Sequence, residues 1–95
     1  MLFRSDGPCV VGSDVALARG AHVRPWSVVG ARGRIGEGAS VERAMLWEDV
    51  TVGAGATLKD CIVANQVKIG AHASLAAGVV LEQGATVPAG ARLPP

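Results

Sequence analysis

The chain has 95 residues, 49% of them hydrophobic, and a net charge of +1. One small domain accounts for this length, and a charge near zero gives no electrostatic basis for binding nucleic acid or an anionic membrane. No apolar run approaches the roughly 20 residues of a membrane helix, and the opening MLFRSD meets charge too early for a signal peptide. We therefore expect a cytoplasmic protein with neither a nucleic-acid nor a membrane partner.

Residues 1–10 lack a regular pattern, and we expect them to form a leading segment or cap. From there on, an aliphatic residue recurs about every six positions. The series runs Val11, Leu17, Val23, Val29, Ile35, Val41, Leu46, Val52, Leu58, Val63, Ile69, Leu75, Leu81, Val87 and Leu93. Two units, 41–45 and 58–62, have five residues instead of six. Neither a helical period nor plain strand alternation generates this series, whereas a fixed short repeat is typical of a solenoid.

Grouped in threes, the units give about five coils over residues 11–95, and both short units fall in the third column. Each unit is predicted to be a very short strand followed by a corner, with its first and fifth residues facing the interior. Glycine or aspartate recurs at the fourth position, as at Gly20, Gly38, Asp14 and Asp49, because these residues tolerate the backbone angles of tight corners.

These units resemble the hexapeptide repeat, and the resemblance covers about residues 11–93. It implies an all-β fold, a single-stranded left-handed parallel β-helix. Residues 41–93, above all VERAMLWEDVTVG and the closing VPAGA, resemble the carboxyl-terminal repeats of sugar nucleotidyltransferases. The nearest are the mannose-1-phosphate guanylyltransferase-like and glucose-1-phosphate nucleotidyltransferase-like proteins. There, an amino-terminal Rossmann-like domain makes the NDP-sugar, and the β-helix serves oligomerisation and, in some members, regulation.

The chain departs from that family by lacking the catalytic half. The glycines of GARGRIGEG, residues 30–38, fall on the repeat and are interpreted as corners, not as a nucleotide-binding loop. No catalytic residue, cofactor or metal ligand is therefore predicted. The predicted function is that of a non-catalytic domain that forms a homo-oligomer and serves an amino-terminal nucleotidyltransferase domain in a parent protein.

Two alternatives stay open. Hexapeptide acyltransferases share the implied fold and use a histidine as general base, so His22 or His72 would act on acyl-CoA in a groove between subunits. Zinc carbonic anhydrases of the same fold need three histidines, and this chain has only these two. The second alternative is a free-standing structural module that assembles with itself.

Trp26, Met45 and Trp47 are the candidate interface residues. Both tryptophans occupy positions predicted to point away from the core, and large exposed aromatic side chains are enriched at protein contacts. Cys9 and Cys61 are predicted to be buried or inert thiols. The arginines close in sequence form a candidate basic side for an anionic effector: Arg19, Arg24, Arg32 and Arg34.

Overall fold

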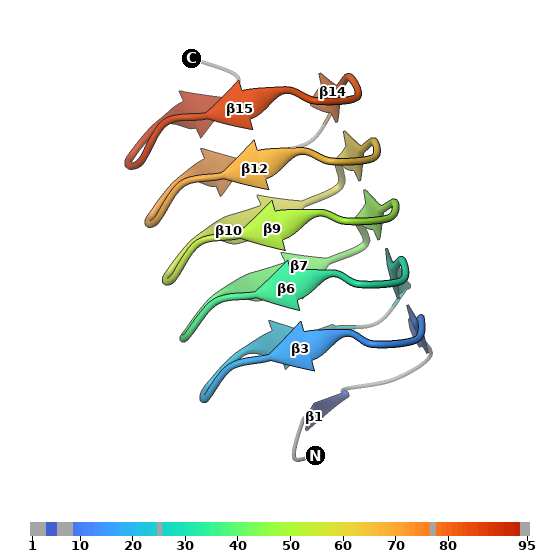
Figure 1. Ribbon diagram of the computed structural model, residues 1–95. Coiled ribbons are helices and arrows are strands. Elements are labelled where there is room, and N and C mark those ends of the chain that lie inside the picture. Colours follow the sequence, from blue (N-terminus) through green and yellow to red (C-terminus); the bar gives the residue numbers. More distant parts are fainter. Residues whose placement is uncertain (1–3, 6–8, 25, 77, 94–95) are drawn as a thin grey trace.

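The computed structural model describes residues 4–5, 9–24, 26–76 and 78–93. These residues form sixteen strands of two or three residues in three parallel sheets (Figure 1). Sheet A contains β1 (Arg4–Ser5), β4 (His22–Val23), β7 (Ser40–Glu42), β10 (Thr57–Lys59), β13 (Ser74–Leu75) and β16 (Arg92–Leu93). Sheet B contains β2 (Cys9–Val11), β5 (Ser27–Val29), β8 (Met45–Leu46), β11 (Ile62–Val63) and β14 (Val80–Leu81). Sheet C contains β3 (Ala16–Leu17), β6 (Arg34–Ile35), β9 (Thr51–Val52), β12 (Lys68–Ile69) and β15 (Thr86–Val87).

The chain passes from sheet B to sheet C to sheet A in every coil, so each strand pairs with the strand three elements later (Figure 1). Five coils run from β2 to β16, and the predicted all-β solenoid of about five coils is confirmed. The body is elongated, measuring 33 × 21 × 18 Å. Within the described residues there is no helix long and apolar enough to cross a membrane.

The interior is a stack of aliphatic ladders. Val29, Leu46 and Val63 lie in register on adjacent strands of sheet B, and each is almost completely buried. Sheets A and C repeat this arrangement with Val41 over Leu58 and with Val52 over Ile69. Fully burying one aliphatic side chain contributes roughly 1.5–3 kcal/mol, so the ladders supply the main stabilisation of the fold.

Left-handed backbone angles form the corners, as the fourth position predicts. Gly20 and Gly38 have φ of 76° and 70°, and Asp14 and Asp49 both have φ of 59°. We name the corners by the sheets they join: BC, CA and AB. Adjacent corners are also linked to each other, since the Asp49 N–H donates to the Ala31 carbonyl at 3.0 Å.

The two five-residue units both lie in the segment that leads from sheet A to sheet B, as predicted. Leu58 pairs with Val41, and Val63 with Leu46, so successive coils there are offset by 17 residues. Val29 pairs with Val11, an offset of 18 residues. The shortening therefore falls in the AB corners and leaves the strand register intact.

The strand ladder extends in front of Val11. Arg4 pairs with His22 in sheet A, and Cys9 pairs with Ser27 in sheet B. The rest of the predicted leading segment, residues 1–3 and 6–8, lies outside the described residues. At the other end of the solenoid, Leu81 and Leu93 are only partly buried against the core.

Candidate interaction face

The outward side chains of sheet B differ in kind from those of the other two sheets. Sheet C presents Ala16, Arg34, Thr51, Lys68 and Thr86, and sheet A presents His22, Ser40, Thr57, Ser74 and Arg92. Sheet B presents Val28, Met45, Ile62 and Val80 at the equivalent position. A solvated outer surface gives no reason for one sheet of three to be apolar.

The exposed large apolar side chains of the described residues all lie on sheet B or beside it. Their exposed fractions are 69% for Trp26, 46% for Met45, 49% for Trp47, 41% for Ile62 and 66% for Val80. Together with the half-buried Val28, these six residues are called the sheet B face. Contiguous exposed apolar patches on a soluble domain mark contact sites more often than a scatter of single residues does.

Strand alternation and coil register build this face. Leu46 points into the core, so its neighbours Met45 and Trp47 both point outward. Across the coils Val28 pairs with Met45, and Met45 with Ile62. Parallel strands lie about 4.8 Å apart, so the outward residues form a continuous apolar row along the solenoid axis.

Trp26 sits in the AB corner between β4 and β5 with a φ of 65°, a conformation that is uncommon for a bulky residue. The left-handed region costs an L-residue roughly 1–2 kcal/mol, and the same corner in a later coil is occupied by Gly78 with a φ of 88°. Packing within the chain does not explain why a tryptophan occupies this corner, because Trp26 is the most exposed of the large apolar side chains. An exposed aromatic residue in a strained position points to a contact outside the chain.

The three interface candidates from the sequence are therefore brought together on one face. Trp26 precedes β5, whereas Met45 and Trp47 belong to the next coil. Sequence reasoning missed Val28, Ile62 and Val80. The signal was present: each of the three comes directly before an interior residue of the first column, as Met45 does.

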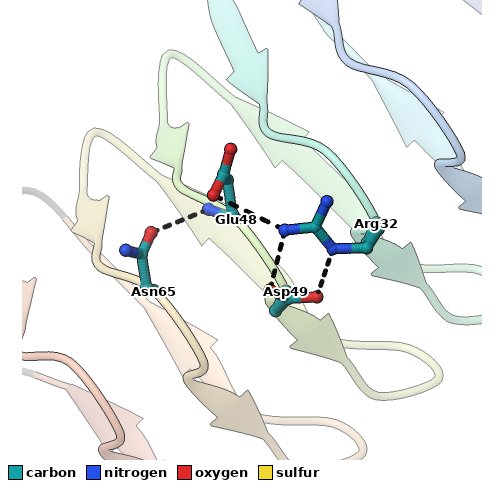
Figure 2. A network of polar contacts seen from close by, with 4 residues as sticks. All are labelled: Arg32, Glu48, Asp49 and Asn65. Carbon is teal, nitrogen blue, oxygen red and sulfur yellow. Dashed lines mark hydrogen bonds and ion pairs between the residues drawn. The ribbon is translucent and has the colours of Figure 1, made fainter.

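Charged residues occupy the BC corners, which border the face. The Arg32 guanidinium donates to both carboxylate oxygens of Asp49, at 2.9 and 3.1 Å, and lies 3.5 Å from Glu48. The Glu48 backbone N–H donates to the Asn65 side chain at 3.0 Å (Figure 2). The hydrogen bond from Arg32, with its positive charge, holds the pKa of the Asp49 carboxyl below its ordinary value.

A second ion pair lies at the AB corners, on the opposite border of the face. The Arg43 guanidinium donates to the two carboxylate oxygens of Asp60 at 2.6 and 2.9 Å. This hydrogen bonding, reinforced by the charge of Arg43, lowers the pKa of the Asp60 carboxyl. Arg43 and Asp60 have φ of 47° and 53°, so each pair links two left-handed corners of adjacent coils.

The histidines lie far apart. His22 is a half-buried residue of β4 on sheet A, whereas His72 is exposed in a CA corner with a φ of 60°. About three coil steps, or roughly 14 Å, separate them along the axis. Within the described ranges, no three His, Cys, Asp or Glu side chains gather at a place that could hold a metal ion.

The arginines do not form the basic side that their closeness in sequence suggested. Arg19 lies in a CA corner, Arg34 on sheet C, and Arg32 in a BC corner where it binds Asp49. Arg24 follows β4 on sheet A. The repeat carries neighbouring residues to different sides of the prism, so closeness in sequence does not become a patch.

Cys61 is buried, as predicted, and burial raises the pKa of its thiol to about 11. The side chain of Cys9 lies outside the described part of the structure. The strand register nevertheless places Cys9 beside Ser27, three coils from Cys61. That separation is roughly 14 Å along the axis, whereas a disulfide needs Cα atoms within about 7 Å.

Comparison with solved structures confirms the fold. A Bacillus cereus protein described as a candidate acetyltransferase superposes with a TM-score of 0.50 and 16% sequence identity. The match covers 85% of this chain and 69% of that chain. No curated protein matches the sequence.

A scan of protein families matches the left-handed β-helix (LbH) domain of eIF2B subunit epsilon over residues 5–93. The chain therefore belongs to the LbH domain family of eIF2B subunit epsilon and is a hexapeptide-repeat left-handed β-helix.

Proposed function

We propose that this chain is a non-catalytic β-helix domain that self-associates and so positions or regulates a sugar nucleotidyltransferase-like catalytic domain. The observation that carries the proposal is the sheet B face, an exposed apolar surface on one side of a prism whose other two sides are polar. The family match along nearly the whole solenoid supports the second half of the proposal.

The geometry of the coils favours assembly over catalysis. The strands of adjacent coils keep offsets of 17 or 18 residues from β2 to β16, so no loop projects from the described coils. His22 lies on sheet A and His72 in a CA corner of another coil, and both are away from the sheet B face. No observation at either histidine favours the acyltransferase alternative, and the structural neighbour supports the fold alone.

Sedimentation velocity over a range of concentrations tests the self-association. Trp47→Ala removes a half-exposed indole from the sheet B face, so the association constant should fall by roughly tenfold or more while the circular dichroism spectrum is unchanged. Lys68→Ala, on the outer side of sheet C, is the matched control and should leave association intact. A Trp47→Ala variant that associates like the wild type would remove the sheet B face from the proposal.

The link to a catalytic domain has a separate test. The reading frame that encodes this segment is expected to encode a nucleotidyltransferase-like domain as well. A complete frame without such a domain would overturn that half of the proposal and leave the free-standing assembly module.

A further inference from the structure

The sheet B face has the size of one half of a small dimer interface. Trp26 and Trp47 are 69% and 49% exposed, and a tryptophan buries about 250 Å², so the two indoles alone present roughly 300 Å². Met45, Ile62 and Val80 extend this area along the axis. Two such patches with their borders bury on the order of 1,000 Å², which is about the least that a specific interface needs.

The two borders of the face carry opposite charge. On the BC side, four carboxylates accompany one guanidinium, a net charge of −3; they are Asp14, Glu48, Asp49 and Glu82, with Arg32. On the AB side, the described residues carry three cations and two carboxylates, a net charge of +1 for this part of the chain; they are Arg24, Arg43 and Lys59, with Glu42 and Asp60. The face therefore has an acidic border and a weakly basic border.

The charges of the two borders favour one orientation of a second copy over another. A two-fold axis parallel to the solenoid axis places the acidic border of one copy against the basic border of the other, with both solenoids running in the same direction. A two-fold axis along the strands instead reverses one solenoid and brings acidic border against acidic border. Opposite charges across an interface attract, and like charges raise the free energy of the complex.

We propose that two copies of this chain pair through the sheet B face about a two-fold axis parallel to the solenoid, each coil facing the same coil of the other copy. This inference rests on the proposed self-association and adds its surface and symmetry. A ring of three would need a second complementary face on every chain, and the outer surfaces of sheets A and C are polar. The single apolar face fits a two-fold pair.

The pairing predicts which residues meet. Val28 of one copy faces Val28 of the other, and Val80 faces Val80. In the reversed arrangement, centred on the middle strand β8, Val28 lies opposite Ile62, and Val80 lies opposite β2. Val80 is then about four coil steps, or roughly 19 Å along the axis, from its own counterpart, and one coil step from Val28 of the other copy. Cross-linking at these two positions separates the two arrangements.

The experiment uses Val28→Cys and Val80→Cys in a background that carries Cys9→Ser and Cys61→Ala. These replacements copy the residues that occupy the same register in the adjacent coils, Ser27 and Ala44. A short bifunctional maleimide should link each variant to itself. An equimolar mixture of the two variants should give few mixed products. Dominant mixed products, or absent self-links in a sample that sedimentation shows to be dimeric, would overturn the pairing while leaving self-association in place.

The salt dependence of the dimer Kd gives an independent test of the parallel arrangement. Attraction between opposite borders is screened by salt, so the dimer Kd should rise at least about threefold between about 50 and about 500 mM NaCl. A Kd that falls over this range would favour like-charged borders and overturn the parallel arrangement. A chain that stays monomeric at every concentration would overturn the proposed self-association itself, which distinguishes the two failures.

Discussion

Gly53→Ala tests how closely the coils approach each other. Gly53 follows β9 and has no left-handed backbone angle, so dihedral preference alone treats alanine as acceptable there. By that criterion the substitution should stabilise the fold by about 0.4–1 kcal/mol, because alanine restricts the unfolded chain. The packing predicts the opposite sign. A Cβ atom at Gly53 would lie 2.5 Å from the backbone nitrogen of Ala71 and 2.6 Å from the carbonyl carbon of Gly70.

The magnitude follows from that contact. Both atoms belong to the backbone of the next coil, so relief requires the coils to separate locally by about 1 Å to restore ordinary van der Waals distance. The hydrogen bond from the Gly53 N–H to the Ile69 carbonyl, 2.7 Å long, opposes this movement. Overpacking costs typically 1–3 kcal/mol, and we expect a net loss of roughly 2 kcal/mol. For a domain of this size the melting temperature should then fall by about 10 °C.

Gly38→Ala is the matched control. Gly38 has a φ of 70°, but a Cβ atom there would meet nothing within 4 Å. Its cost is dihedral strain of about 1–2 kcal/mol, partly offset by the restricted unfolded chain. Thermal and urea unfolding followed by circular dichroism, at one protein concentration, should therefore rank Gly53→Ala below Gly38→Ala. Equal stabilities, or a Gly53→Ala variant at least as stable as the wild type, would refute the reasoning.

Three further predictions follow from individual side chains. Arg43 holds the pKa of Asp60 below its ordinary value, so the stability this carboxylate contributes is present above its unfolded-state pKa and is lost as pH falls through the folded-state value. In the Asp60→Asn variant the urea midpoint of unfolding should fall less steeply as the pH is lowered below about pH 4. An unchanged slope would argue against a stabilising contribution from the Arg43–Asp60 ion pair. Burial raises the pKa of Cys61 to about 11, so iodoacetamide at pH 8 should not modify this thiol in the native protein. Alkylation of Cys61 should appear when the protein is unfolded. Rapid labelling of Cys61 in the native protein, located by peptide mapping, would contradict its burial. Trp26→Gly should be more stable than Trp26→Ala by about 1 kcal/mol in the monomer, because both lose the indole but only glycine relieves the left-handed strain; identical melting curves would remove that strain from the account.

Most of the fold was predictable because a six-residue repeat constrains every coil in the same way. The placement of both five-residue units in the third column came from the sequence, and the 17-residue pairing of Leu58 with Val41 confirms it. Corner positions were predictable for Gly20 and Asp14. Arginine in a left-handed corner was not, because Arg32 and Arg43 adopt it with the help of carboxylates that lie one coil away.

The candidate interface was only partly predictable. Trp26, Met45 and Trp47 attracted attention because tryptophan and methionine are rare in this chain, whereas outward valine and isoleucine are hard to distinguish from core residues in one sequence. Val28 and Val80 become visible only when the residues before each first-column aliphatic are compared across coils. The oppositely charged borders depend on which corner each residue occupies, which spacing along the chain does not reveal directly.

The stacking of similar coils means that the length of this domain can be changed one coil at a time. Each coil contacts only its neighbours, so duplicating the segment from Leu46 to Ile62 would add one 17-residue coil and lengthen the prism by about 4.8 Å. Any domain attached at one end would then be displaced by that step and turned by the twist of one coil. The distance between tethered partners can thus change by insertion or loss of a single coil without a new fold, and the copied Trp47 and Ile62 would extend the sheet B face by the same step.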